Sequence, residues 1–181
     1  LRWPGLRAIA LGPVVLWTGF AILSLLAGLT YAVIRLEERR KYLRYLSETD
    51  KLTGIYNRSG FDDQLDHHLR WHPEQPCIVA ELDIDNFKFI NDLYGHPTGD
   101  RALQTLASSL RRFFASDVII GRNGGDEFCL LLPGETRTSV AGKLRAFCSV
   151  PKTFAYEDQL HAFTISMGYA EYPTQASTRE G

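Results

Sequence analysis

The chain has 181 residues, of which 20 are Lys or Arg and 21 are Asp or Glu, and 45% are apolar. This length suits one domain with a real core, and the modest Gly (15) and Pro (8) content excludes a disordered or collagen-like chain. Since Arg2 and Arg7 are the only charged residues before Arg35, the remainder carries a net charge of −3. An acidic domain lacks the positive surface that nucleic-acid polymers require, so we expect no such partner.

The first expected element is a transmembrane helix over residues 8–34, which contain no charged side chain. About 20 apolar residues cross a bilayer, and Trp17 and Tyr31 suit its interfaces. A buried core helix and a signal peptide are the alternatives. Five basic residues follow the segment and two lie in the flank 1–7, which predicts a single pass with the larger part in the cytoplasm. Because residue 1 is Leu rather than Met, we expect an earlier part of the protein to precede it.

Residues 35–49 are predicted to form a juxtamembrane helix. Leu36, Leu43 and Leu46 occupy heptad-like positions over only about two heptads, so a coiled coil and a solvated helix both remain open. The three cysteines are too far apart for a metal or redox motif, and we expect them to be free thiols.

The remaining chain alternates helical and strand patterns. Asn57 is a suitable cap for a helix that runs to about Trp71, whose His68 and His72 are expected on its solvated face rather than on a metal. The other expected elements are a strand at 77–83, helices at 86–93 and 98–114, strands at 118–120 and 128–132 joined by a Gly124-Gly125 turn, a helix at 136–148 and a strand at 160–171. This order predicts an α/β or α+β fold, with a mixed central sheet flanked by helices.

Two acidic clusters indicate chemistry. Asp83-Ile84-Asp85 ends an expected central strand, and Asp126-Glu127 follows the glycines of the expected hairpin. Carboxylates that meet at the end of a sheet are typical of a cation site, and oxygen ligands favour Mg²⁺ or Mn²⁺. Gly124 and Gly125 carry no side chains that would keep a ligand from the backbone. Two ordinary acidic turns are the alternative.

Four segments, in order, resemble the motifs of the GGDEF family, the diguanylate cyclases. They are Asp50-Lys51-Leu52-Thr53-Gly54-Ile55-Tyr56-Asn57-Arg58; Asp83-Ile84-Asp85-Asn86-Phe87-Lys88-Phe89-Ile90-Asn91-Asp92; Tyr94-Gly95-His96 with Gly99-Asp100; and Arg122-Asn123-Gly124-Gly125-Asp126-Glu127-Phe128. The resemblance covers residues 50 to about 172. It implies a palm-like sheet, as in nucleotidyl cyclases, and condensation of two GTP molecules into cyclic di-GMP with release of two pyrophosphates.

The resemblance also implies residue roles, each paired with the residues that would fill it. The ligands of two Mg²⁺ (or Mn²⁺) ions would be Asp83, the Ile84 carbonyl, Asp126 and Glu127, and the catalytic acids would be Asp126 and Glu127. Guanine would be bound by Asn91 and Asp100. The rest of GTP would be bound by Asn86, Phe87, Lys88, Gly124 and Gly125. Asp50 and Arg58 are expected to pair and couple the preceding helix to the domain, whereas Arg122 is expected in a structural salt bridge. Activity would require a homodimer, in the inner membrane of a bacterium.

Departures from the family pattern define the alternatives. An Arg-x-x-Asp product-inhibition site is not expected, because Ala115 and Val118 stand at its positions and Asp117 is one residue out of register. The family domain continues beyond the strand with Ser166-Met167-Gly168 into a basic helix, so the domain at 50–181 is expected to be incomplete. A non-catalytic GTP-binding module that regulates an attached domain is the rival function. A related cyclase or polymerase acting on other nucleotides is disfavoured by Asn91 and Asp100.

Overall fold

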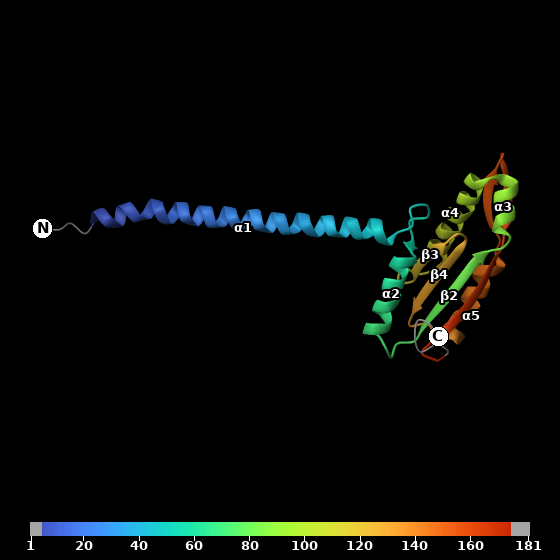
Figure 1. The fold of residues 1–181 in the computed structure, drawn as a ribbon. Helices are drawn as coiled ribbons and strands as arrows, with labels where there is room; N and C mark the ends of the chain where they lie inside the picture. The colour runs from blue at the N-terminus through green and yellow to red at the C-terminus, as the bar shows by residue number, and fades with distance from the viewer. Residues whose placement is uncertain (1–4, 175–181) are drawn as a thin grey trace. The chain divides into compact units, whose positions relative to one another are not determined.

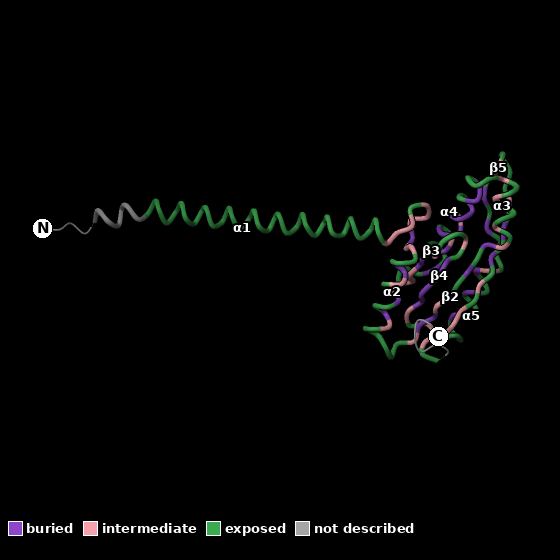
Figure 2. The backbone as a smooth tube through the Cα atoms, viewed as in Figure 1, coloured by how far each residue is buried: buried purple, intermediate pink, exposed green. Residues whose placement is uncertain are grey.

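The computed structural model describes residues 5–174, with side chains described from residue 12 onward. Helix α1 runs without a break from Gly5 to Glu48 and so joins the expected segments 8–34 and 35–49 into one element. Its described side chains are exposed as far as Ser47, as Figure 2 shows in green. By length and composition, α1 is the one described helix that is long and apolar enough to cross a membrane. The chain divides into two compact units between Leu46 and Ser47.

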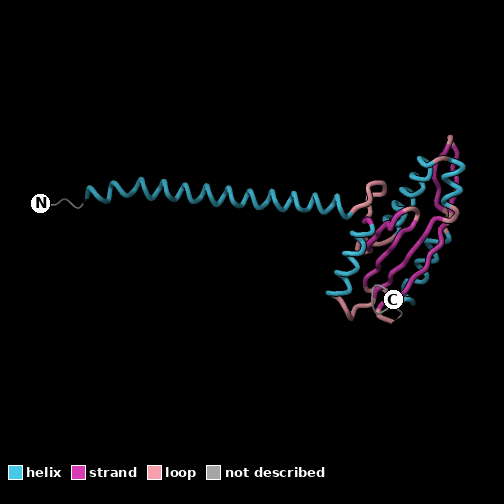
Figure 3. The backbone as a smooth tube through the Cα atoms, viewed as in Figure 1, coloured by secondary structure: helices cyan, strands magenta, loops and turns pink. Residues whose placement is uncertain are grey.

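The second unit is built on a five-stranded sheet (Figures 1 and 3). Its strands, in spatial order, are β1 (Tyr56–Asn57), β3 (Ile119–Gly124), β4 (Glu127–Pro133), β2 (Cys77–Ile84) and β7 (Ile165–Tyr172). Strand β1 is parallel to β3, and all other neighbours are antiparallel. Strand β2 therefore lies between β4 and β7, as expected for a central strand that ends in carboxylates.

Four helices accompany this sheet: α2 (Arg58–Trp71), α3 (Phe87–Tyr94), α4 (His96–Phe113) and α5 (Arg137–Ser149). The larger core joins α4 and α5 to one sheet face, with Leu106, Leu130 and Val140 fully buried in it. A smaller cluster packs Phe61 and Leu65 of α2 on the other face. The expected mixed α+β fold with a central sheet between helices is confirmed.

The expected strand at 160–171 is wrong in one respect, because it is two strands that belong to different sheets. Strand β6 (Gln159–Phe163) pairs with β5 (Lys152–Tyr156), a strand that the sequence analysis missed, to form a separate hairpin. Strand β7 pairs with β2. Thr164 separates β6 from β7, and its carbonyl accepts a hydrogen bond from the Asp85 amide at 3.0 Å. This contact with the end of β2 marks the point where the chain changes sheets.

Helix α2 begins as expected, because the Asn57 side chain accepts a hydrogen bond from the Gly60 amide at 2.9 Å. The expectation for its histidines is only half right. His72 is exposed, whereas His68 is 6% exposed and its Nε2 has no hydrogen-bond partner. The three cysteines are free thiols, as expected, and Cys77 and Cys129 are buried.

Candidate active site

The two acidic clusters meet at one end of the sheet. Side chains alternate along β2, so Leu82 and Ile84 are buried in the larger core while Asp83 is exposed on the opposite face. Leu82 is paired with Phe128 in β4, which brings the end of β2 beside the hairpin that carries Asp126 and Glu127. This juxtaposition is the one predicted from the sequence.

The pKa of Asp83 is consistent with this clustering of carboxylates. Its carboxyl pKa is raised by partial burial, by a hydrogen bond with Asp126 and by the negative charges of Asp126 and Glu127. Like charges held this close disfavour ionisation, and a divalent cation would remove the repulsion. The Asp83 and Asp126 carboxylates and the Ile84 carbonyl supply oxygen donors only, which is the chemistry that Mg²⁺ and Mn²⁺ prefer. Across residues 5–174, no group of three His, Cys, Asp or Glu residues is gathered closely enough to hold a metal alone. The residues therefore fit a cation that takes its remaining ligands from substrate phosphates and water.

The hairpin turn lies one residue later than predicted. Gly124 is the last residue of β3, and Gly125 and Asp126 form the two-residue turn before Glu127. Gly124 and Gly125 have φ values of 131° and 55°, which are conformations that residues with a Cβ rarely adopt. No atom lies within 4 Å of where their Cβ atoms would be, so the backbone here is open to a ligand.

Arg122 fixes the conformation of this turn. Its Nε donates to the Gly125 carbonyl at 2.9 Å, and its Nη1 donates to both carboxylate oxygens of Asp50 at 3.1 Å. The predicted pairing of Asp50 with Arg58 is therefore wrong, whereas the structural salt bridge expected of Arg122 is present. Burial opposes ionisation of Asp50, but hydrogen bonds from Thr53 and Arg122 outweigh it and hold its pKa below the usual value.

Asp85 faces a different set of partners from Asp83. Its carboxylate accepts hydrogen bonds from the hydroxyl groups of Ser166, at 2.6 Å, and Thr164, at 2.5 Å. These two hydrogen bonds lower the pKa of Asp85 and link the end of β2 to the start of β7 and to Thr164, the residue before it. Asp85 is thus a structural residue of the site.

The residues expected to contact the nucleotide outside the glycine hairpin lie along α3 and at the start of α4, and an elbow at Gly95 joins these two helices. Asn86 precedes α3 in a left-handed conformation, with φ 57° and ψ 33°. Phe87 is half-buried, Lys88 and Asp100 are exposed, and Asn91 is half-buried. The Asn91 side chain lies directly against Gly99 of α4, where a Cβ atom would be 2.0 Å from its Oδ1. The elbow therefore brings the two expected guanine contacts, Asn91 and Asp100, onto neighbouring turns of two helices.

A hollow of about 340 Å³ opens beside the carboxylates. Its lining includes Asp83, Glu127, Asn123 and three residues of β7, Ser166, Met167 and Gly168. Sequence reasoning did not select Asn123, Ser166 or Gly168 as site residues. Ser166 and Gly168 reach the site because they are paired with Asp83 and Glu81 across the β2–β7 ladder, a register that the sequence alone does not specify.

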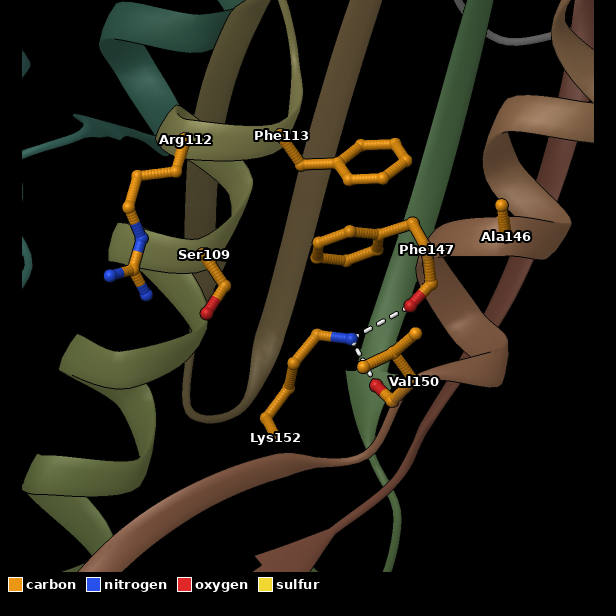
Figure 4. Close-up of a pocket in the computed structure, with 7 residues that line it drawn as sticks. All are labelled: Ser109, Arg112, Phe113, Ala146, Phe147, Val150 and Lys152. Carbon is orange, nitrogen blue, oxygen red and sulfur yellow. Dashed lines mark hydrogen bonds between the residues drawn. The ribbon is translucent and has the colours of Figure 1, made fainter.

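A second hollow, of about 280 Å³, lies between α4 and α5 (Figure 4). The Lys152 Nζ reaches it and donates to the carbonyl oxygens of Phe147, at 2.7 Å, and Val150. These carbonyls belong to the end of α5, where backbone acceptors lack helical partners. Burial lowers the Lys152 pKa, and its ammonium group also lies 4.1 Å from the centroid of the Phe147 ring. Lys152 therefore caps α5 and stabilises the fold.

Fold and site together define a mixed α+β domain with a glycine hairpin that presents carboxylates beside a central strand. The family model described as "Diguanylate cyclase, GGDEF domain" matches residues 47–180. The chain belongs to the GGDEF family. This agrees with the four motifs and with the meeting of the two acidic clusters at one end of the sheet.

Individual relatives and structures are consistent with this assignment. The chain is 37% identical over 106 residues to the cyclic di-GMP phosphodiesterase PdeR of Escherichia coli, and this alignment covers 58% of the chain and 16% of PdeR. It is 36% identical over 103 residues to the probable diguanylate cyclase DgcC of Escherichia coli, covering 55% of the chain and 28% of DgcC. The structure of the coiled coil and GGDEF domain of DgcB from Caulobacter crescentus, in complex with c-di-GMP, is similar with a TM-score of 0.70 and 33% identity over 83% of each chain. The chain spans only a minor part of PdeR and DgcC.

Proposed function

We propose that the chain is part of a membrane-anchored diguanylate cyclase that condenses two GTP molecules into cyclic di-GMP and two pyrophosphates. The observation that carries this proposal is the complete Gly124-Gly125-Asp126-Glu127 hairpin beside Asp83. A module that merely packs against other proteins has no need to gather three carboxylates where burial and their mutual repulsion together raise the pKa of Asp83.

The chemistry consists of two equivalent steps. In each, the 3′-hydroxyl oxygen of one GTP bonds to the α-phosphorus of the other, the bond from that phosphorus to its bridging oxygen breaks, and pyrophosphate leaves with the electron pair. Glu127 accepts the hydroxyl proton or joins Asp83, the Ile84 carbonyl and Asp126 as a metal ligand. When bound, two Mg²⁺ or Mn²⁺ ions would acidify the hydroxyl and neutralise charge on the phosphates.

Recognition of GTP falls to the α3–α4 elbow. The Asp100 carboxylate accepts from the N1–H and 2-amino groups of guanine, and the Asn91 amide supplies a further hydrogen bond. Adenine has no proton on N1, so ATP would leave these polar groups unpaired and bind more weakly. Backbone N–H groups near Asn86 and Phe87, the Lys88 ammonium and the bare backbone at Gly124 and Gly125 receive the phosphates.

Two further features belong to the proposal. Each protomer holds one GTP, so the reaction requires a homodimer in which two half-sites face each other. Residues 8–34 anchor the chain in the inner membrane of a bacterium, residues 35–49 continue as a juxtamembrane helix, and the domain from residue 50 lies in the cytoplasm. The apolar length of α1 supports the membrane anchor, and the basic residues that follow residue 34 support this orientation.

The test uses the whole protein in detergent, with GTP and Mg²⁺, and measures cyclic di-GMP by chromatography. The parent is compared with an Asp126→Ala, Glu127→Ala variant and with Asp63→Ala, which removes an exposed carboxylate of α2 as a control. We expect product from the parent and from the control only. A folded, dimeric parent that binds GTP but forms no product would refute the cyclase and favour a regulatory GTP-binding module.

A further inference from the structure

The β5–β6 hairpin holds the last residue of α3. The Tyr94 hydroxyl and the His161 Nδ1 are 3.1 Å apart and form a hydrogen bond. The Tyr94 ring also lies within a cluster of hairpin rings, with centroid distances of 4.7 Å to His161, 5.0 Å to Tyr156 and 5.7 Å to Phe154. One side chain of α3 is thereby fixed by a hairpin about 60 residues further along the chain.

Tyr94 is one helical turn from Asn91. The backbone of this turn is held at both ends, because the Asn91 carbonyl accepts from the Gly95 amide at 2.9 Å and the Tyr94 carbonyl accepts from the Thr98 hydroxyl at 2.9 Å. Gly99, the next residue, is in contact with the Asn91 side chain. Tyr94 and Asn91 therefore belong to one hydrogen-bonded segment, in which the position of one bears on the position of the other.

The same hairpin also contacts α4. Arg101 donates from Nη1 to the Ala155 carbonyl of β5 at 3.3 Å. Arg101 is adjacent in sequence to Asp100, just as Tyr94 is one turn from Asn91. The hairpin thus holds one neighbour of each residue that the proposed function assigns to guanine, although it contributes no side chain to the carboxylate hollow.

We propose that the β5–β6 hairpin positions the guanine-recognition elbow, with His161 acting through Tyr94 as a positioning residue. This inference rests on the proposed function, in which Asn91 and Asp100 bind the base. Hydrogen-bonding groups discriminate between bases only when their spacing is held within about 0.5 Å, and a short elbow between two helices needs outside support for that. The hairpin provides this support from both helices.

The experiment measures binding of two non-reacting nucleotides to the whole protein in detergent with Mg²⁺. The probes are analogues of GTP and ATP with a methylene group between the α- and β-phosphorus atoms. His161→Phe and Tyr94→Phe each keep an aromatic ring but remove one side of the hydrogen bond. Leu160→Ala is the control, because this side chain is 77% exposed on the same strand.

We expect each single variant to raise the Kd for the GTP analogue about fivefold, the effect of losing one neutral hydrogen bond. The double variant should bind no more weakly than either single variant, since both remove the same interaction. The ATP analogue should bind all variants as it binds the parent, because only the recognition of guanine depends on the elbow. The control should match the parent with both nucleotides.

Other results would overturn the inference. Unchanged binding of the GTP analogue by both single variants would show that the hairpin does not position Asn91. An equal loss for both analogues, or a lower melting temperature with unchanged binding, would assign the hairpin a structural role only. A parent that does not prefer the GTP analogue would instead overturn the proposed guanine recognition, a failure that is visible without any variant.

Discussion

Replacing Gly99 by Ala is a sharp test of the elbow, because it should separate nucleotide affinity from folding. The added Cβ would lie 2.0 Å from the Asn91 Oδ1, 3.0 Å from its Cγ and 3.3 Å from the Phe87 Cζ. The first two atoms belong to the end of a side chain that can rotate away. Accommodation therefore moves the Asn91 amide out of its present position and leaves the backbone of α4 in place.

The magnitudes of the two effects differ. Gly99 lies within α4, where Ala is favoured over Gly by about 1 kcal/mol. Forcing the Asn91 side chain off its preferred rotamer costs about 1 kcal/mol, so the free energy of unfolding should be nearly unchanged. Loss of the hydrogen bond that the proposed function assigns to Asn91 and guanine should weaken GTP binding by about tenfold.

The assay combines thermal unfolding with a titration of the GTP analogue. Gly142→Ala is the matched control, because Gly142 lies within α5 and no atom is within 4 Å of its Cβ position. The control should gain up to about 1 kcal/mol of stability and bind nucleotide normally. A Gly99→Ala variant that binds GTP as tightly as the parent, while Asn91→Ala does not, would refute the argument that Gly99 is required by the Asn91 side chain.

Three further substitutions test the electrostatics and burial of the domain. Asp83→Asn should stabilise the chain without metal by less than about 1 kcal/mol at pH 7, because solvent screens the repulsion at this exposed carboxylate. This gain should vanish in urea unfolding at low pH, because Asp83, whose pKa is raised, is then protonated in the parent. The variant should also lose the stabilisation by Mg²⁺ that the proposed function predicts for the parent. Arg122→Lys should lower the free energy of unfolding by about 2 kcal/mol. In acid unfolding, the difference in stability between parent and variant should shrink below pH 3.8, because Asp50, whose pKa is lowered, becomes protonated there. His68→Leu should stabilise the domain by about 1 kcal/mol, because it removes a buried nitrogen without a hydrogen-bond partner. Since the His68 pKa is lowered, the parent should lose more stability than the variant in thermal unfolding as the pH falls below 6.5.

Local features of the fold could be predicted from the sequence. The Asn57 cap of α2 and the glycine hairpin depend on a few consecutive residues, and the structure contains both. The hairpin was misplaced by one residue, since the chain irregularity between Arg122 and Gly124 shifts the register of β3 against β4. Such a bulge depends on the pairing of two strands, which a single strand's composition does not reveal.

Long-range contacts could not be predicted in the same way. The salt bridge from Asp50 selects Arg122, 72 residues away, rather than the nearby Arg58. His68 was expected on a solvated surface because helical periodicity identifies a polar stripe but not the neighbours that bury it. Strand β5 could not be predicted in this way, because it begins with Lys152 and a lysine does not indicate a buried strand position. Lys152 is buried because its ammonium group caps the preceding helix.

The carboxylate site could be predicted from the two acidic clusters, which are local features of the sequence. From Ala80 to Ile84, strand β2 alternates buried apolar residues with exposed acidic ones, and this alternation places Asp83 on the exposed face. The structure then holds that carboxylate against Asp126 and Glu127 although their charges repel. A sequence selected for stability alone would avoid this arrangement, and the repulsion is consistent with the proposed function, in which a cation lies between these carboxylates.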